Sequence, residues 1–355
     1  MKISIITLHA MHNPGSVYQA YALEKYLDGK GFDAEIIDYR PSYFYIEGSG
    51  VKAIVKYLIK KIVFYNRYRK RSKSFDSFIK GQMKLTDRFH TFHELEKASF
   101  ISDVFIVGSD QLWNTDFLCG KDPSFYLKFV KNGKKISYST SVGKQVIDSK
   151  NVEVLKNNLN EFISISVREE VTSKQLSQIL NREVQWVCDP VFLLNAEEYS
   201  KFIGKNEVGL PYVMVYLSPQ SKTLDKIVDY YKNKGYKIVL VGGYTKRCNC
   251  DIHIKDAGPL DFLTYIYYAD TVVSTSFHAT AFSHIFHKNF VSIVPERNGN
   301  RILSLLNKTG LMNKAVIDGD IDFPVIDTKI TWDDVDVKLN DYIISSKAYL
   351  KKCLS

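Results

Sequence analysis

Short apolar runs alternate with amphipathic stretches along this 355-residue chain. An apolar run bounded by turn residues is typical of a buried strand, and an apolar stripe with helical period is typical of a helix packed on a sheet. Alternation of the two predicts an α/β fold with parallel sheets. The runs predict strands at residues 2–7, 34–38, 104–107, 135–138, 163–167, 212–217, 238–241, 271–274 and 290–293.

The amphipathic stretches predict helices, and the length of the chain predicts two domains. Helices are expected at about 17–29, 224–234, 260–269 and 330–354. A chain of this length is usually divided into domains of roughly 150 to 200 residues. The sequence changes character near Val187–Val191. We therefore expect one α/β domain over residues 1–189 and a second over residues 190–355.

Polar residues follow several of the predicted strands. Gly108, Ser109, Asp110 and Gln111 come directly after the strand that ends at Val107. The strand at 135–138 leads into Ser139–Ser141, and the strand at 163–167 leads into Arg168–Glu170. The carboxyl ends of parallel strands lie at one edge of a sheet, where open α/β sheets bind ligands. These polar residues are therefore predicted to meet at one edge.

Residues 269–286 form the most informative segment. A strand ending at Ser274 leads through Thr275 and Ser276 to His278, and a helical apolar stripe follows. Free backbone N–H groups at a helix N-terminus favour an anion, so the pattern suits His278 as a proton donor above a bound anion. A histidine that merely caps a structural helix fits this segment equally well.

Four segments, in this order, resemble the polysaccharide pyruvyl transferase family. They are NPGSVYQAYALEKYL from residue 13, VGSDQLWN from 107, SVREE from 166 and YYADTVVSTSFHATAFSHIFHKNF from 267. The resemblance extends from the first strand to about residue 310. Two positions depart from the family pattern: Ala279 replaces a glycine, and Ser16 replaces a small apolar residue.

The resemblance implies a glycosyltransferase-B-like architecture of two Rossmann-like domains, with the active site in the interdomain cleft. The N-terminal domain would then face the acceptor and the C-terminal domain the donor. The implied reaction transfers a pyruvyl group from phosphoenolpyruvate to a sugar diol, giving a pyruvate ketal in surface polysaccharide biosynthesis. The acceptor would be a sugar or a lipid-linked oligosaccharide.

The resemblance also suggests roles for individual residues. Arg168 matches the donor-binding arginine of the family, although an ion pair with Glu169 or Glu170 is an alternative. His278 matches the family histidine and is expected to act as the acid or as a phosphate contact. Glu169 is a candidate base for the acceptor hydroxyl. Expected substrate contacts are Asn13, Gly15, Ser109, Asp110, Gln111, Ser276 and Arg301.

Two other functions remain open. The first is a nucleotide-sugar-dependent glycosyltransferase of the same architecture, but no acidic residue suited to ribose hydroxyls stands out after Gly242-Gly243. The second is a non-catalytic member of a polysaccharide assembly, which the presence of both Arg168 and His278 disfavours.

Composition and motifs limit the cofactors and partners. The net charge of +9 suits anionic substrates or an acidic surface. The chain has no G-x-G-x-x-G motif for a dinucleotide. Cys248-x-Cys250 with His253 lacks the usual ligand spacing of zinc sites, and the aspartates at 318, 320 and 322 suit a solvated turn. We predict no metal, no cofactor and no nucleic-acid partner.

Residues 51–73 are rich in basic residues and contain no acidic residue. A basic amphipathic helix can lie on an anionic membrane surface. The alternative, which the sequence favours, is a helix whose apolar stripe packs on its own domain. The chain shows no signal peptide or membrane span, and its five cysteines suit a reducing compartment. We expect a cytoplasmic location, with peripheral contact at the inner face of the membrane through residues 51–73 as an open alternative.

Overall fold

The computed structural model describes residues 1–45, 55, 59, 63–216, 220–243, 245–296, 298–317 and 319–355. The chain forms two compact units, and each is described by itself. Unit 1 comprises Met1–Tyr65, Phe75–Leu193 and Tyr342–Ser355, and unit 2 comprises Asn66–Ser74 and Leu194–Asp341.

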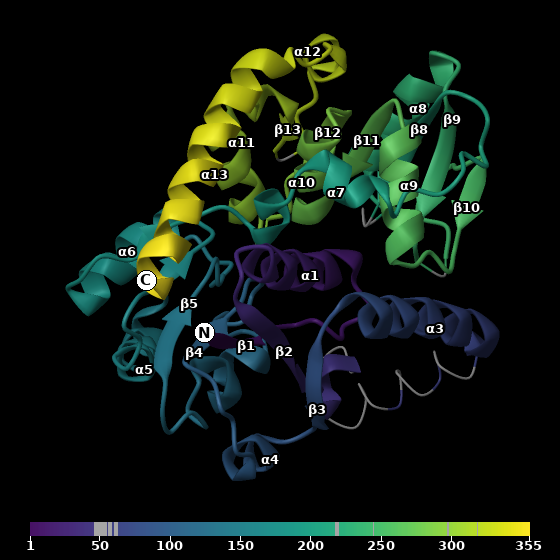
Figure 1. Ribbon diagram of the computed structural model, residues 1–355. Coiled ribbons are helices and arrows are strands. Elements are labelled where there is room, and N and C mark those ends of the chain that lie inside the picture. The colour runs from purple at the N-terminus through teal and green to yellow at the C-terminus, as the bar shows by residue number, and fades with distance from the viewer. Residues whose placement is uncertain are drawn as a thin grey trace. The chain divides into compact units, whose positions relative to one another are not determined.

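Unit 1 contains a five-stranded sheet in the order β3-β2-β1-β4-β5, in which all neighbouring strands are parallel (Figure 1). This is the strand order of a Rossmann-like doubly wound sheet. A separate parallel pair joins β6 and β7. The elements are β1 (Lys2–Ile6), α1 (Pro14–Asp28), β2 (Asp33–Tyr39), α3 (Tyr65–Gln82, whose Asn66–Ser74 part belongs to unit 2), β3 (Leu85–Phe89), α4 (Phe92–Lys97), β4 (Val104–Val107), β5 (Lys134–Ser137), α5 (Ser149–Leu159), β6 (Ser166–Val167), α6 (Glu170–Leu180) and β7 (Gln185–Trp186).

Unit 2 contains a six-stranded parallel sheet in the order β10-β9-β8-β11-β12-β13. Counted within the unit, this is the order 3-2-1-4-5-6 of a doubly wound dinucleotide-binding fold. The elements are α7 (Ala196–Ser200), β8 (Tyr212–Tyr216), α8 (Lys222–Asn233), β9 (Lys237–Val241), β10 (Ile252–Ile254), α9 (Pro259–Tyr268), β11 (Thr271–Ser274), α10 (Phe277–Ile285), β12 (Asn289–Ile293), α11 (Asn300–Thr309), β13 (Ala315–Val316), α12 (Phe323–Asp327) and α13 (Trp332–Leu354, which ends in unit 1).

Short 3-10 helices link these elements. They are η1 (Ser42–Tyr45), η2 (Cys119–Lys121), η3 (Pro123–Tyr126), η4 (Pro190–Leu193) and η5 (Met312–Lys314).

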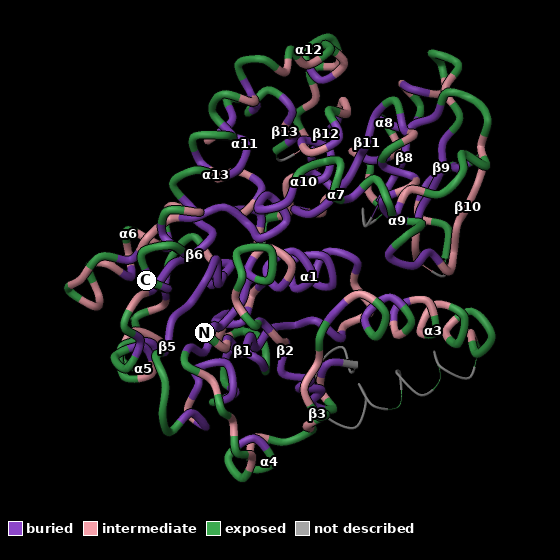
Figure 2. The backbone as a smooth tube through the Cα atoms, viewed as in Figure 1, coloured by how far each residue is buried: buried purple, intermediate pink, exposed green. Residues whose placement is uncertain are grey.

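The central strands of both sheets are buried along their length (Figure 2). All four residues of β4 and all five of β8 are buried. Helices on both faces exclude water from a parallel sheet, which is why its inner strands are continuous apolar runs rather than alternating ones. Such strands leave only their ends to carry polar groups, and this arrangement brings polar side chains to the edge of each sheet.

Helix α1 begins earlier than the sequence pattern predicted. It begins at Pro14, at the first helical position, and the side chain of Asn13 caps it by accepting a hydrogen bond of 2.9 Å from Gly15 N. Proline is well suited to this position because its missing N–H has no helical partner there. The residues between Pro14 and the predicted start near residue 17 are therefore helical rather than loop.

The two compact units do not coincide with the ranges 1–189 and 190–355 expected from the sequence. The last turns of α13 belong to unit 1, where the Tyr349 hydroxyl donates to Ser137 O at 2.9 Å. In the same unit the ring of Tyr342 packs on Trp186 with centroids 5.0 Å apart. A terminal helix can thus return to the first unit because its buried face carries large aromatic side chains.

The expectation that the apolar stripe of residues 51–73 packs on the core is wrong for three of its residues. Val55, Ile59 and Val63 are 46%, 55% and 65% exposed. The basic residues Lys52, Lys56, Lys60 and Lys61 lie outside the described residues. Within the described parts of the chain, no helix has the length and apolarity that crossing a membrane would require.

Candidate functional site

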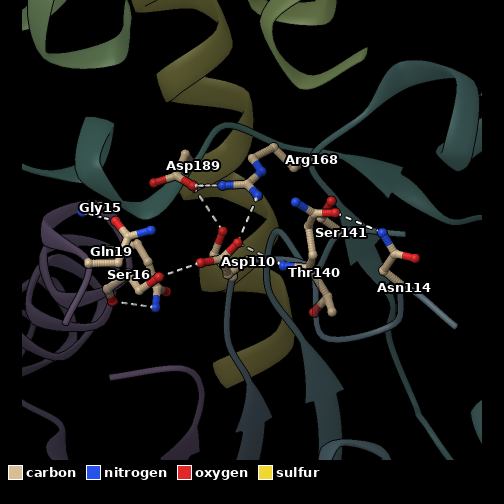
Figure 3. Close-up of polar contacts among 12 residues, drawn as sticks. Gly15, Ser16, Gln19, Asp110, Asn114, Thr140, Ser141, Arg168 and Asp189 are labelled. Carbon is tan, nitrogen blue, oxygen red and sulfur yellow. Dashed lines mark hydrogen bonds and ion pairs between the residues drawn. The ribbon is translucent and has the colours of Figure 1, made fainter. Parts of the chain in front are cut away.

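Polar side chains gather at the carboxyl edge of the unit 1 sheet, as the sequence predicted (Figure 3). The turn after β4 brings Ser109 and Asp110 next to Thr140, which follows β5 and forms a parallel bridge with Asp110. Thr140 also bridges Val167, the last residue of β6. The next residue along the chain is Arg168. The ends of three strands, β4, β5 and β6, thus meet at one place.

Arg168 lies at the centre of this group. Its Nη1 donates to Asp189 Oδ2, and its Nη2 lies 3.7 Å from Asp110 Oδ1. Burial opposes the charged guanidinium, but the negative charges of Asp189, Asp110 and Glu169 outweigh burial and raise the pKa of Arg168. Arg168 is therefore held as a cation in a cluster where carboxylates outnumber it.

The ion pair of Arg168 differs from the alternative raised by the sequence. That alternative was a pair with Glu169 or Glu170, but Asp189 takes the place of both. Glu170 instead pairs with Lys174, one helical turn further along α6, at 2.7 Å. The difference arises because the chain after β7 returns to this sheet edge and places Asp189 beside the guanidinium.

Asp110 has an unusual backbone for a residue other than glycine, with φ at +83°. Its carbonyl accepts hydrogen bonds from Leu112 N at 2.8 Å and Ser141 N at 2.9 Å, which hold the turn. Its Oδ2 accepts from Ser16 Oγ at 2.6 Å, and its Oδ1 accepts from Gln111 N at 2.8 Å. The start of α1 is thereby connected to the turn after β4.

Buried hydrogen bonds extend the cluster toward β1. Gln19 Nε2 donates to Ser16 O at 2.8 Å and to Thr7 Oγ1 at 2.9 Å. Thr7 Oγ1 in turn donates to Ser109 O at 2.9 Å, and Ser109 Oγ donates to Asp189 Oδ2 at 2.9 Å. Such a network holds the carboxylates of Asp110 and Asp189 in fixed positions.

The other residues predicted for this unit have more local roles. Asn13 caps α1 through Gly15 N, as described above. The Gln111 side chain accepts from Asn114 Nδ2 at 2.7 Å and packs on Gly143. A Cβ at Gly143 would lie 2.4 Å from Gln111 Oε1, and the φ of +73° there also favours glycine. Gln111 is thus positioned from two sides.

Glu169, the predicted base, is fully buried. Its Oε1 accepts a hydrogen bond from Ser141 Oγ, and the residue precedes the first turn of α6. A base must contact the hydroxyl from which it takes a proton, so this burial disfavours Glu169 in that role. The role of Glu169 as general base stays a prediction, and its burial is evidence against that role.

Sequence reasoning missed Asp189 and the His9–Asp38 pair. Asp189 was interpreted only as part of a domain boundary. Its place between the apolar pair Val187-Cys188 and Pro190 could have indicated a functional polar residue. His9 is fully buried, and its Nε2 lies 2.8 Å from Asp38 Oδ1. Burial would raise the pKa of Asp38, but hydrogen bonds from His9 and Arg40 outweigh it and lower that pKa. Asp38 is therefore ionised inside unit 1.

Unit 2 holds the second group of predicted residues. Ser276 caps α10, and its Oγ accepts from Ala279 N at 3.4 Å. His278 is the second residue of α10 and is 5% exposed, so it is more buried than a residue at an open cleft. Arg301 is the second residue of α11 and is half-buried. Both residues lie in the first turn of a helix, where the dipole favours negative charge.

The predicted absence of a metal can be compared with the described residues only. Among the described residues, no three His, Cys, Asp or Glu side chains gather as metal ligands. His253 Nε2 instead faces the carbonyl oxygens of Gly242 and Gly243, at 3.2 and 3.1 Å. The first aspartate of the 318–322 motif lies outside the described residues.

A family model, polysaccharide pyruvyl transferase, matches residues 13–297. The chain belongs to this family. The match includes the Asp110 turn, Arg168 and His278, the residues on which the resemblance rested. No curated protein gives a significant match to this family member.

Solved structures show the same fold at low sequence identity. The UDP-GlcNAc 2-epimerase of Methanocaldococcus jannaschii is 14% identical, with a TM-score of 0.52 over 98% of this chain and 100% of that one. An α-glucosyltransferase solved with UDP and DNA is 9% identical, with a TM-score of 0.53 over 98% and 90%. A putative UDP-N-acetylglucosamine 2-epimerase of Listeria monocytogenes is 8% identical, with a TM-score of 0.52 over 99% and 97%.

These similarities establish the architecture of this pyruvyl transferase family member. It is glycosyltransferase-B-like, with two Rossmann-like domains. At such low identity, the substrates in the names of those proteins are not carried over to this chain.

Proposed function

We propose that this family member is a ketal-forming pyruvyl transferase. The donor is phosphoenolpyruvate, and the acceptor is a sugar diol, free or lipid-linked, in the biosynthesis of a surface polysaccharide. The observation that carries the proposal is the family match over residues 13–297. The polar strand ends of unit 1 and the helix starts of unit 2 supply chemical groups that this reaction needs.

The reaction needs an acid and a base, with all atoms accounted for. Protonation of the enol methylene turns it into a methyl group and makes the adjacent carbon electrophilic. Two acceptor hydroxyls then bond to that carbon in turn, and phosphate leaves with its bridging oxygen. Of the two hydroxyl protons, one balances the proton added to the methylene, and the other leaves on hydrogen phosphate.

His278 is proposed as the acid, or as a contact of the donor phosphate. Its place in the first turn of α10 supports this, because N–H groups there attract a phosphate or carboxylate. Arg301, in the first turn of α11, is a second proposed contact for the donor. Ser276 caps α10 and holds the turn that carries His278.

Arg168 is proposed to contact the donor through its planar guanidinium. Asp189 fixes the orientation of that group, which suits bidentate recognition of a carboxylate. The competing role is a purely structural ion pair with Asp189. These two roles differ in what they predict for donor affinity.

A nucleotide-sugar-dependent glycosyltransferase is the second candidate function. The observation in its favour is the fold shared with the α-glucosyltransferase solved with UDP. A non-catalytic role in a polysaccharide assembly is the third candidate. It gives no function to His278 in the first turn of α10, which argues against it.

We further propose a cytoplasmic protein that touches the inner face of the membrane through residues 51–73. The exposure of Val55, Ile59 and Val63 supports this, since these side chains suit the region between headgroups and acyl chains. Exposed basic residues such as Arg67 and Arg69 suit anionic lipids.

Phosphate release tests the proposed reaction. The protein is incubated with phosphoenolpyruvate and a panel of nucleotide-linked and lipid-linked sugars. Acceptor-dependent release of inorganic phosphate, with a product heavier by one pyruvyl ketal, supports the proposal. Turnover of a nucleotide-sugar with phosphoenolpyruvate unused would establish the glycosyltransferase alternative.

A further inference from the structure

We propose that Asp110 is the general base that removes the proton from the attacking acceptor hydroxyl. This inference rests on the proposed function and assigns the base to a residue that the sequence marked only as a substrate contact. It replaces Glu169, which is fully buried and bonded to Ser141.

Access distinguishes Asp110 from the two other carboxylates of the cluster. The side chain of Asp110 is 11% exposed, whereas that of Asp189 is 0% exposed and Glu169 is fully buried. Asp110 is therefore the carboxylate of this cluster that an incoming hydroxyl can best approach.

Its hydrogen bonds hold the Asp110 carboxylate in one orientation. Ser16 Oγ donates to Oδ2 at 2.6 Å, from the start of α1. Gln111 N donates to Oδ1 at 2.8 Å, and Arg168 Nη2 lies 3.7 Å from the same oxygen. Three donors from three parts of unit 1 thus surround the group. A base oriented in this way needs little rearrangement at the moment of proton transfer.

The charge around Asp110 suits a neutral partner. Asp110, Asp189 and Glu169 lie around a single guanidinium, that of Arg168. Such a cluster repels an anion unless the anion binds Arg168 directly. It stabilises a hydroxyl group whose oxygen becomes more positive as it attacks. The acceptor sugar is neutral at the hydroxyls that react, and the carboxylates stabilise the positive charge that develops there.

The backbone at Asp110 supports the same conclusion. A φ of +83° costs a non-glycine residue about 1–3 kcal/mol, and the surrounding structure must impose it. Glycine would adopt this turn without strain, but it carries no carboxylate. The strained turn directs the Asp110 side chain toward Ser16 and Arg168 (Figure 3).

The proton transfer is balanced within the proposed reaction. The acceptor oxygen forms its bond to the ketal carbon while its proton moves to an Asp110 oxygen. The protonated Asp110 then passes the proton to the departing phosphate, directly or through water, and returns to its ionised form. No oxidant, reductant or metal is needed.

The substitution Asp110→Asn removes the negative charge of the side chain and keeps its shape, so it tests the charge without disrupting the fold. Asparagine also tolerates positive φ. Its side-chain oxygen can accept from Gln111 N while its amide N–H donates to Ser16 Oγ, so the turn is expected to survive. Phosphate release from phosphoenolpyruvate is measured with methyl β-galactopyranoside, methyl α-mannopyranoside and methyl β-glucopyranoside as diols, and with water alone. We expect a loss of about 100- to 10,000-fold in kcat. Affinity for phosphoenolpyruvate should be kept or raised, because the variant removes a negative charge beside Arg168.

Asp76→Asn is the matched control. Asp76 is a carboxylate that pairs with Arg40 at 3.3 Å and is 44% exposed, outside the cluster. It should leave kcat unchanged. Asp110→Gly, which relieves the backbone strain, should be folded and as inactive as Asp110→Asn.

The outcomes separate this role from the proposed function. An active wild type together with an Asp110→Asn variant within about threefold of it would overturn the role of Asp110 alone. So would a variant whose loss lies entirely in donor affinity. A wild type that neither binds phosphoenolpyruvate nor releases phosphate would overturn the proposed function, and with it this role.

Discussion

Arg168 and Asp189 form an ion pair whose side chains are only 1% and 0% exposed. A buried pair of this kind adds little net stability, but the loss of one partner costs about 3–5 kcal/mol because a charge is left uncompensated. The pair joins the end of β6 to the segment after β7. It therefore fixes the guanidinium against Asp110, and this arrangement gives rise to the first prediction.

Arg168→Lys should weaken binding of phosphoenolpyruvate by at least about tenfold, because an ammonium cannot reproduce bidentate recognition of a carboxylate. Calorimetric titration measures the effect, and thermal unfolding shows whether the variant is folded. Arg40→Lys is the control, since Arg40 is another buried arginine of unit 1, paired with Asp38 rather than with the cluster. Unchanged donor affinity in Arg168→Lys would make Arg168 a structural ion-pair partner only.

His278→Ala should lower turnover by about 100- to 10,000-fold, the usual contribution of a positioned acid. Because His278 is buried, circular dichroism and thermal unfolding must show that the variant is folded. His284→Gln is the matched control on the same helix. His284 bonds to Thr280 O and faces Thr309 Oγ1, so it should not affect turnover. A His278→Ala variant that keeps most of its activity would remove His278 from catalysis.

The burial of His284 predicts a pH dependence of stability. Burial lowers its pKa from 6.5 to about 4, so the unfolded chain binds more protons between these two values. The stability contributed by neutral His284 is therefore complete above the unfolded pKa and is lost as pH falls toward the folded pKa. Between pH 7.5 and 4.5 the wild type should lose about 2.5 kcal/mol more than His284→Gln. Urea unfolding at both pH values measures this, and equal losses in the two proteins would contradict it.

Much of the fold follows from the sequence for a physical reason. The inner strands β1, β4, β8 and β11 are buried on both faces, so they appear as continuous apolar runs that propensity and pattern identify well. β3 was not predicted, because its residues LTDRF are half-buried or exposed at the edge of the sheet and show no apolar run. Edge strands owe their structure to a neighbour, which a local pattern does not reveal.

The candidate site was predictable only where its residues follow strands. Ser109, Asp110 and Arg168 could be identified because each comes directly after an apolar run. Asp189 could not be paired with Arg168, since the contact depends on how β7 returns to the sheet. The exposure of Asp110 relative to Glu169 was equally hidden, because neighbouring polar residues at strand ends look alike in a sequence.

The basic run predicts salt-sensitive binding to anionic membranes. Each Lys or Arg near such a surface contributes about 1 kcal/mol. Sedimentation with phosphatidylserine-containing vesicles compares the wild type with Arg67, Arg69 and Lys73 changed to Gln, and with Val55, Ile59 and Val63 changed to Ser. Both variants should pellet less than the wild type, and high salt should release the wild type. If all three proteins partition equally, the run is a solvated surface with no role at the membrane.

The most direct measurement of the central claim is a calorimetric titration of the wild-type protein with phosphoenolpyruvate, run beside titrations with UDP and UDP-sugars. A pyruvyl transferase should bind phosphoenolpyruvate saturably, and His278→Ala or Arg168→Lys should weaken that binding. UDP should show no comparable binding, and neither should a UDP-sugar, unless that UDP-sugar is itself the acceptor. Saturable binding of a UDP compound with no detectable binding of phosphoenolpyruvate would contradict the account and favour the nucleotide-sugar alternative.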